Sequence, residues 1–218
     1  DCLFSETNYL PERRLQVGTL LLVQNAGHFS REFERLTLQH APAPMARWGW
    51  YAKTRWVRRS TVKASAITVQ TAALKNAIAG QIARSEERIA VVPHGCGQVE
   101  VGRPRKFRER GRWRIGYLTH FGVQKNFGVL FRAGRVLVEK GFDIELVISI
   151  DPGSPCFMAI ARDRRDAGLD AGTVRNLGQI RGTEISSSYD SLDIAVFPSL
   201  CESFGFPLVE GMARGLPT

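Results

Sequence analysis

The sequence has 218 residues, of which 44% are hydrophobic and 23% are charged, and both values are ordinary for a globular protein. No run approaches the ~18 consecutive apolar residues of a membrane-spanning helix, so no transmembrane segment is predicted. The net charge is +9, and the excess lies in one region, because residues 35–84 contain nine Lys or Arg and no acidic residue.

The ends and the cysteines indicate the context of the protein. Asp1 begins the chain without a signal-peptide pattern, and residues 216–218 end it where another strand would start, so we expect a fragment truncated at both ends. The wide spacing of the cysteines is typical of reduced cytosolic thiols rather than of disulfides or a zinc site. The cysteines are Cys2, Cys96, Cys156 and Cys201.

In the first half of the sequence, short apolar runs alternate with amphipathic segments. Strands are predicted at residues 19–23, 65–70 and 88–92. Helices are predicted at residues 31–39, 45–59 and 72–83. Thr71 is placed to cap the last of these helices. Strands that alternate with helices predict a parallel sheet.

The predicted helix at residues 45–59 contains three Trp, one Tyr and five basic residues. Aromatic side chains among cations suit an anionic membrane surface, which would be bound through Arg47–Lys63. They would also suit single-stranded nucleic acid, which we regard as the less favoured partner. A third interpretation is an ordinary helix that packs its aromatic side chains and solvates its cations.

Residues 97–114 show no clear period and contain seven Lys or Arg against two Glu. We therefore predict a basic interdomain linker at residues 99–113, between domains at residues 1–98 and 114–218. A charge run of this kind is usually solvated and needs no ligand.

The second half of the sequence predicts four more strands, separated by helices. The strands are expected at residues 114–119, 144–150, 174–180 and 194–197. The helices are expected after Asn126 as N-cap, at residues 156–167, around Tyr189, and from Pro207 to Arg214 with Gly215 closing it. This order predicts a doubly wound parallel sheet.

Charged side chains and backbone amides follow the first and the last of these strands. Lys125 lies in the loop at residues 120–125, Glu202 in the loop at residues 199–206, and Glu210 in the predicted first turn of the next helix. If both loops rise at the same sheet edge, these groups and the amides of residues 204–208 line one cleft. A Lys and a helix N-terminus suit a diphosphate, and a carboxylate suits a vicinal diol. The expected ligand is a phosphorylated sugar.

Two simpler explanations exist for individual residues of this cleft. Glu210 could complement the helix dipole in the first turn, and Lys125 could be a surface residue before a helix. The combination with the spacing Glu202-x7-Glu210 favours a binding site over both.

Several segments resemble the retaining glycosyltransferases of the GT4 type, the glycosyl transferases group 1. They are Pro93-His-Gly95, Gly116…Lys125-Asn126, Leu177-Gly178 and residues 196–217 with their E-x7-E block. The resemblance implies the α/β GT-B fold, with two Rossmann-like doubly wound parallel-sheet domains that are both incomplete here. Residues 1–98 would be the C-terminal part of the acceptor-side domain. Residues 114–218 would be the N-terminal part of the nucleotide-sugar-binding domain.

The resemblance also implies roles for individual residues. Glu202 would be catalytic, in contact with the donor hexose, and Glu210 would hold the ribose hydroxyls. Lys125 would pair with the diphosphate. The remaining donor contacts would come from His120, Gly178, Ile180, Phe204, Gly205 and Phe206.

The sequence departs from this family pattern at two places. His120 stands where many members have an Arg, and it is a weaker partner for a diphosphate. Gln24 and Asn25 stand on the acceptor side where many members have a His or Asp, and neither can serve as a base. Retention in which the phosphate of the donor accepts the proton would not require a base.

The expected function is transfer of a hexose, with retained configuration, from a nucleotide diphosphate sugar to a glycan or lipid-linked acceptor in bacterial-type surface polysaccharide synthesis. No metal and no cofactor are expected, and residues 1–218 alone are expected to be inactive. The expected location is the cytoplasm, with peripheral attachment at the inner face of the plasma membrane. Alternatives are a GT-B phosphorylase or sugar-nucleotide epimerase, or a basic nucleic-acid or anionic-lipid binding module with a vestigial sugar site.

Overall fold

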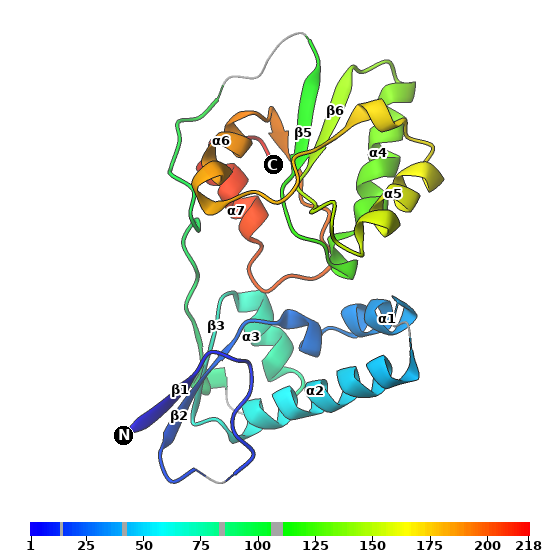
Figure 1. Ribbon diagram of the computed structural model, residues 1–218. Coiled ribbons are helices and arrows are strands. Elements are labelled where there is room, and N and C mark those ends of the chain that lie inside the picture. The colour runs from blue at the N-terminus through cyan, green and yellow to red at the C-terminus, as the bar shows by residue number, and fades with distance from the viewer. Residues whose placement is uncertain (14, 41–42, 83–85, 106–110) are drawn as a thin grey trace. The chain divides into compact units, whose positions relative to one another are not determined.

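A computed structural model describes residues 1–13, 15–40, 43–82, 86–105 and 111–218 of the chain (Figure 1). The chain forms two compact units. Unit 1 contains residues 1–94 and 200–204, and unit 2 contains residues 95–199 and 205–218. Each unit has its own four-stranded sheet, and the neighbouring strands in both sheets pair in parallel.

The sheet of unit 1 has the order β1-β2-β3-β4. Its strands are β1 (Cys2–Ser5), β2 (Gly18–Val23), β3 (Ala66–Val69) and β4 (Ile89–Val91). The sequence predicts the last three, because each contains an apolar run. It does not predict β1, whose four residues at the edge of the sheet are exposed or half-buried and therefore carry no strong hydrophobic signal.

Helices complete unit 1. They are the 3₁₀ turns η1 (Ala26–Phe29) and η2 (Glu86–Arg88) and the helices α1 (Arg31–His40), α2 (Pro44–Lys63) and α3 (Ala72–Ala79). Thr71 caps α3 as predicted, since its Oγ1 accepts a hydrogen bond of 3.2 Å from the amide of Leu74. The predicted end of α3 at residue 83 lies outside the described residues, and the helix itself ends at Ala79.

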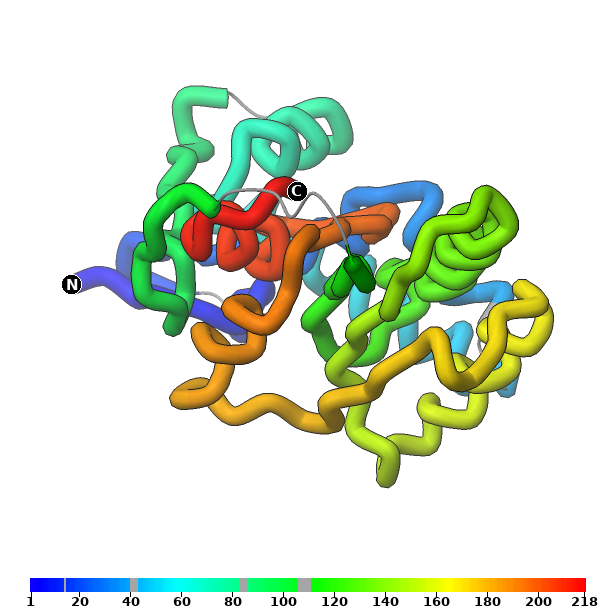
Figure 2. Tube along the Cα trace, turned by 90° about the horizontal axis from the view of Figure 1, so that it is seen from above, coloured from blue at the N-terminus to red at the C-terminus, as the bar shows by residue number. Residues whose placement is uncertain are grey.

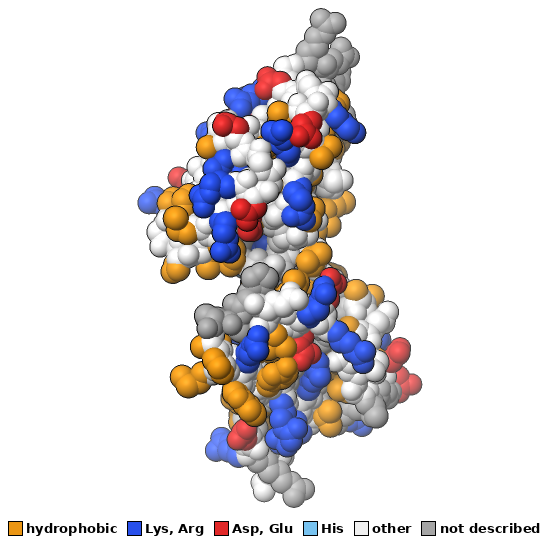
Figure 3. All heavy atoms as spheres, turned by 90° about the vertical axis from the view of Figure 1, so that its right-hand side faces the viewer, with side chains coloured by type: hydrophobic (Ala, Val, Ile, Leu, Met, Phe, Trp, Pro, Cys, Tyr) orange, Lys and Arg blue, Asp and Glu red, His pale blue; other side chains and the backbone are white. Residues whose placement is uncertain are grey.

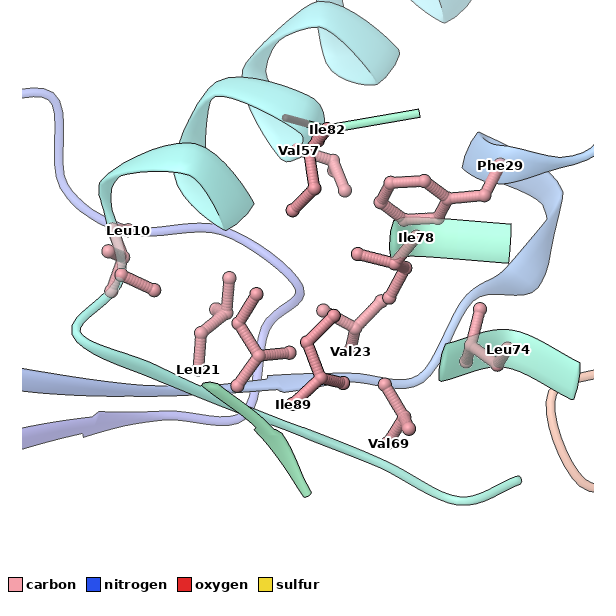
Figure 4. Close-up of a cluster of buried hydrophobic side chains, with 12 residues drawn as sticks. Leu10, Leu21, Val23, Phe29, Val57, Val69, Leu74, Ile78, Ile82 and Ile89 are labelled. Atoms are coloured by element: carbon pink, nitrogen blue, oxygen red, sulfur yellow. The ribbon is translucent and has the colours of Figure 1, made fainter. Parts of the chain in front are cut away.

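The core of unit 1 lies between its sheet and its helices. Leu21, Val23 and Ile89 project from the strands toward Val57 of α2 and Ile78 of α3 (Figure 4). Alternate residues of β2 are buried, as the period of two of a strand requires. Both the strands and the helices of this unit are therefore held by one apolar cluster.

Unit 2 has the strand order β7-β6-β5-β8. Its strands are β5 (Trp113–Tyr117), β6 (Ile144–Ile148), β7 (Val174–Asn176) and β8 (Ile194–Ala195). Its helices are α4 (Phe127–Glu139), α5 (Phe157–Asp166), α6 (Ile185–Asp190) and α7 (Phe206–Ala213), with the 3₁₀ turns η3 (Val123–Lys125), η4 (Ala171–Thr173) and η5 (Gly182–Glu184). Helices α4 and α5 cover one face of the sheet, and α6 and α7 cover the other (Figures 1 and 2). This is the predicted doubly wound arrangement.

The first part of the predicted basic linker packs against unit 2. Val99 is buried in the cluster beneath α6 and α7, and the amide of Gly102 donates a hydrogen bond of 2.7 Å to the carbonyl of Ala213. Arg105 and Arg214 both form ion pairs with Asp190. The expectation of a solvated charge run is therefore wrong for Arg105, because its guanidinium has a carboxylate partner. Residues 106–110 of the predicted linker lie outside the described residues.

Candidate functional site

The loops that follow β5 and β8 begin at the same edge of the unit 2 sheet. The chain enters this sheet at β5, continues to β6 and β7 on one side, and returns to β8 on the other side of β5. In open α/β sheets, ligands bind at the carboxyl ends of the strands where the direction of winding reverses. The strand order therefore brings the loop of Lys125 and the start of the loop after β8 to such a point.

Glu210 is a buried carboxylate with one strong partner. It is 8% exposed, and its Oε2 accepts a hydrogen bond of 2.9 Å from the hydroxyl of Tyr189, a buried residue of α6. Burial raises the pKa of Glu210, and the hydrogen bond from Tyr189 opposes this increase. Burial and the neighbouring Glu210 raise the pKa of Tyr189 far above its usual value, so the phenol stays protonated and donates.

The prediction that Glu210 lies in the first turn of its helix is wrong. Helix α7 begins at Phe206, one residue before Pro207, and Glu210 falls in its second turn. The first turn has no acidic residue. Dipole complementation therefore does not explain Glu210, because that effect is confined to the first turn.

Close backbone approaches surround Glu210 and the start of α7. A Cβ added to Gly97, whose φ is +69°, would lie 3.0 Å from Oε1 of Glu210. Gly205 precedes α7 with a φ of +91°, and a Cβ there would lie 2.9 Å from the ring of Phe197. Gly205 is thus needed for the turn into the helix, and Gly97 brings main chain against the second carboxylate oxygen. The sequence alone does not indicate Gly97 or Tyr189 as a site residue.

The amide row predicted at residues 204–208 is shorter than expected. The amide of Leu208 donates to the carbonyl of Gly205 at 3.0 Å, so it is already used in the first turn. Phe206 has an exposed side chain and begins the helix. Leu208 therefore does not belong to the predicted anion contact, and Pro207 has no amide hydrogen to donate.

Lys125 is 3% exposed, so the interpretation as a surface residue is wrong. It ends η3, immediately before Asn126, which has a left-handed backbone with φ of +57°. Asn126 stands at the N-cap position of α4 but does not cap with its side chain. Its Nδ2 instead donates a hydrogen bond of 3.2 Å to the carbonyl of Pro198, which ties the loop after β5 to the loop after β8.

The other predicted donor residues of unit 2 lie on the loops after β5 and β7. His120 is exposed. Gly178 has a φ of +72°, and its amide donates to Oδ1 of Asn176 at 3.2 Å. Ile180 is half-buried and packs against the apolar cluster that contains Val99. The side chain of Ile180 therefore contributes to packing in addition to any contact with a base.

Glu202 and Phe204 belong to unit 1. Ser203, which lies between them, holds the segment of residues 200–204 to the rest of this unit. The Oγ of Ser203 accepts a hydrogen bond of 2.9 Å from the amide of Ala26 and donates to the carbonyl of Gln24. Its carbonyl accepts a hydrogen bond of 3.0 Å from Thr71. The predicted catalytic Glu202 and the predicted acceptor-side residues 24–25 thus lie in one part of unit 1.

Two of the predicted residues of unit 1 have structural partners. The Oδ1 of Asn25 accepts from the amide of Gly27 at 2.9 Å and caps η1. The ring of Phe204 meets that of His94 edge-on at a centroid distance of 5.3 Å.

The Cys201 thiol is half-buried, and burial together with the nearby carboxylates Glu202 and Glu32 raises its pKa. A nucleophilic role for Cys201 is not supported, because a reactive cysteine needs a lowered pKa.

His28 is a further polar residue at the carboxyl end of β2. It is 1% exposed, its Nδ1 lies 2.9 Å from Oγ1 of Thr54, and its ring stacks on Trp50 at 4.8 Å. Its Nε2 has no hydrogen-bond partner within the described ranges. Burial, with smaller contributions from Lys53 and Arg58, lowers the pKa of His28 to about 4. The imidazole is therefore neutral at physiological pH.

His28 predicts a loss of stability in acid. The unfolded chain binds a proton near pH 6.5 and the folded chain only near pH 4, so the free energy of unfolding of unit 1 should fall by roughly 3 kcal/mol over this window. Urea unfolding at a series of pH values, followed by the fluorescence of the Trp residues in α2, measures this slope. His28→Phe should flatten this slope, because it removes the buried imidazole. Equal slopes in the wild type and His28→Phe would contradict the assignment.

Two properties of the described residues concern metals and membranes. No group of three or more His, Cys, Asp or Glu side chains in these ranges is arranged to hold a metal ion. Within the same ranges, every helix is too short or too polar to cross a lipid bilayer.

Comparison with known proteins extends the resemblance. Residues 112–218 match the family model of glycosyl transferases group 1. The chain is 26% identical over 187 residues to the MMP alpha-(1->4)-mannosyltransferase of Mycolicibacterium hassiacum. The aligned region covers 86% of this chain and 44% of that protein. It is 26% identical over 171 residues to an uncharacterized glycosyltransferase of Methanocaldococcus jannaschii, with 72% and 42% covered. The chain thus spans less than half the length of these curated relatives.

A solved structure supports the fold. Sucrose-phosphate synthase from Thermosynechococcus elongatus superposes with a TM-score of 0.65 at 16% identity, over 94% of this chain and 50% of that one. Together with the parallel sheets and their helices, this likeness confirms the predicted GT-B Rossmann-like fold. The resemblance to glycosyl transferases group 1 is confirmed for residues 112–218. The GT4 type and the truncation at both ends stay predictions.

Proposed function

We propose that the protein is a retaining glycosyltransferase that moves a hexose from a nucleotide diphosphate sugar to a glycan or lipid-linked acceptor. The observation that carries the proposal is the buried carboxylate of Glu210, held by Tyr189 beside the start of α7. A buried carboxylate with an oxygen left for further hydrogen bonds suits a vicinal diol. The family model over residues 112–218 and the names of the mannosyltransferase and sucrose-phosphate synthase support sugar transfer.

In this proposal unit 2 binds the donor. Glu210 accepts hydrogen bonds from the ribose hydroxyls, and Lys125 with His120 neutralises the diphosphate. The amides of Gly205 and Phe206 contact sugar and phosphate, while Gly178 and Ile180 bracket the base. The burial of Lys125 strengthens its interaction with a phosphate, since the local dielectric is low.

The segment of residues 200–204 and the loop after β2 contribute the sugar and acceptor contacts in the same proposal. Glu202 contacts the hexose and is the proposed catalytic carboxylate, with Phe204 beside it. Gln24 and Asn25 lie on the acceptor side, near Ser203. Because the Asn25 oxygen already caps η1, its amide nitrogen is the group that would meet an acceptor.

The proposed reaction retains configuration and uses neither a metal nor a cofactor. The bond between the anomeric carbon and the diphosphate oxygen breaks, and the acceptor oxygen bonds to the same face of that carbon. The acceptor proton moves to the departing phosphate oxygen, so no side chain has to act as base. The proposed setting is surface polysaccharide synthesis in the cytoplasm, at the inner face of the plasma membrane.

A panel of nucleotide sugars tests the donor assignment. A bound donor should raise the thermal midpoint of the protein, because a ligand at a hundred times its Kd stabilises the folded state by about 2.7 kcal/mol. At least one diphosphate sugar should stabilise the protein more than its free nucleoside. No shift with any nucleotide sugar or nucleoside diphosphate would overturn the proposed function.

Tyr189 should act on donor binding through Glu210. In Tyr189→Phe the hydrogen bond that lowers the pKa of Glu210 is lost, so the carboxylate protonates at a higher pH. Donor affinity, measured by calorimetry across pH, should therefore decline at a higher pH in this variant than in the wild type. Tyr117→Phe is the matched control, because it removes an equally buried hydroxyl that lies 2.6 Å from Oγ of Ser199. The same pH shift in both variants would contradict the role of Tyr189.

A further inference from the structure

The solvent side of α2 carries large apolar side chains that the fold does not bury. Met45 is 84% exposed and Trp48 is 75% exposed. Tyr51 and Val62 are also exposed, and the four positions recur at a spacing close to one or more helical turns. The buried residues of α2, among them Val57, lie on the opposite side of the helix. The exposed apolar side chains therefore lie outside the core that the described residues of unit 1 form.

The other two Trp residues of α2, Trp50 and Trp56, pack against aromatic rings of unit 1. Trp50 stacks on the ring of His28. Trp56 stacks on Tyr9 at 4.1 Å, and its Nε1 donates a hydrogen bond of 3.0 Å to the carbonyl of Leu10. The interpretation of an ordinary helix that packs its aromatic side chains is thus correct for these two residues. It does not account for Trp48.

Charge is distributed unevenly along the same side of α2. The C-terminal half contains Arg55, Arg58, Arg59 and Lys63, and these line one groove of about 650 Å³ together with Tyr51 and Val62. Glu34 is the acidic residue in this lining. The N-terminal half borders a second groove of about 490 Å³, lined by Trp48 and Tyr51 with Arg35 and Arg47. On the face of unit 1 seen in Figure 3 (lower part of the view), hydrophobic and basic side chains lie beside one another.

This distribution fits a lipid surface better than a nucleic acid. Trp and Tyr favour the interface between headgroups and acyl chains, and Lys or Arg bind the phosphates of anionic lipids. Single-stranded nucleic acid would need rings on which successive bases stack along a cationic groove. Here two rings, those of Trp48 and Tyr51, are exposed on the helix, and its most exposed apolar side chain is Met45, which offers no ring. Arg55, Arg58, Arg59 and Lys63 lie toward the other end of the helix, while Arg35 and Arg47 flank Trp48.

We propose that the solvent side of α2 (Met45, Trp48, Tyr51, Arg55, Arg59, Val62 and Lys63) docks unit 1 on an anionic phospholipid surface. Met45 and Trp48 enter the interface, while Arg55, Arg59 and Lys63 contact lipid phosphates. The surface lies entirely in unit 1, so the proposal does not depend on donor binding by unit 2.

Sedimentation with vesicles tests the docking surface. Binding should be strong to vesicles of phosphatidylcholine mixed with phosphatidylglycerol and weak to phosphatidylcholine alone. Arg55→Ala/Arg59→Ala should weaken binding roughly thirtyfold, since each basic residue near the surface contributes about a fivefold factor. Arg162→Ala/Arg165→Ala removes the same charge from exposed positions of α5 and should keep most of the binding.

A second comparison tests the apolar part. Trp48→Ser should weaken binding to mixed vesicles about tenfold, while Met158→Ser, at an exposed position of α5, should not. Brominated lipid should quench the wild-type fluorescence more than that of Trp48→Phe. Equal losses in the two Arg pairs, or no effect of Trp48→Ser, would overturn the proposal. Binding to single-stranded oligonucleotides without binding to vesicles would overturn it in favour of nucleic acid.

Discussion

Replacing Glu210 by Gln should lower the affinity for the nucleotide sugar donor by roughly a hundredfold or more, because charge-assisted hydrogen bonds to two hydroxyls contribute about 1.5–3 kcal/mol each. Gln keeps the shape of the side chain and can still accept the hydrogen bond of Tyr189. The change therefore isolates the negative charge. Calorimetry with the donor that stabilises the protein most measures the effect.

The control for Glu210→Gln is the same substitution at a carboxylate outside the proposed site. Glu139 lies on the surface of α4, where it forms an ion pair with Arg135 at 2.7 Å. Glu139→Gln should leave donor affinity unchanged, because an exposed pair of this kind contributes little. Unchanged affinity in Glu210→Gln would reject Glu210 as the ribose contact. The substitution Glu210→Gln itself should leave the fold intact, since α7 is also held by the Tyr189 contact and by apolar packing.

Replacing Gly215 by Ala should destabilise unit 2 by about 3 kcal/mol, from a strained backbone and a steric overlap. Gly215 has a φ of +70°, and an added Cβ would lie 2.3 Å from the carbonyl oxygen of Arg103. The neighbouring amide of Arg105 donates to the carbonyl of Gly215. The methyl group would therefore push residues 103–105 away from α7. The midpoint and slope of urea unfolding measure the change.

Gly141 provides a matched control for the steric part. It follows α4 with a φ of +83°, and a Cβ there would meet nothing within 4 Å. Gly141→Ala should therefore cost only the backbone strain of about 1 kcal/mol. If the two substitutions cost the same, the close approach between Gly215 and Arg103 does not exist in solution.

Local pattern was enough to predict most of the secondary structure of this chain. Apolar runs such as Leu20–Val23 and Ile144–Ile148 form strands because burial on a parallel sheet favours them, whatever the distant sequence. Gly141 and Gly215 close their helices because glycine adopts the left-handed backbone that lets amides after the helix bond to its last carbonyl groups. Strand β1 was not predicted, because an edge strand of four residues buries little apolar surface and shows no clear hydrophobic pattern in the sequence.

The E-x7-E block was evident from spacing, but its environment was not. Tyr189 lies 21 residues before Glu210, and only the packing of α6 against α7 brings its hydroxyl to the carboxylate. Burial of Lys125 depends in the same way on the loops after β5 and β8, which are joined through Asn126 and Pro198. Such contacts are decided by tertiary packing, because sequence periodicity describes one element at a time.

By itself, the sequence determined the α/β class and, apart from the edge strand β1, the order of strands and helices, since these follow from local periodicity. It also predicted, from side-chain chemistry, which residues bind a phosphorylated sugar. The tertiary structure alone decided which of them share an environment. It placed the segment of residues 200–204 with unit 1, buried Glu210 beside Tyr189, and left Met45 and Trp48 exposed. The physical reason is that burial and the pKa of a side chain depend on neighbours that the fold brings from distant parts of the chain.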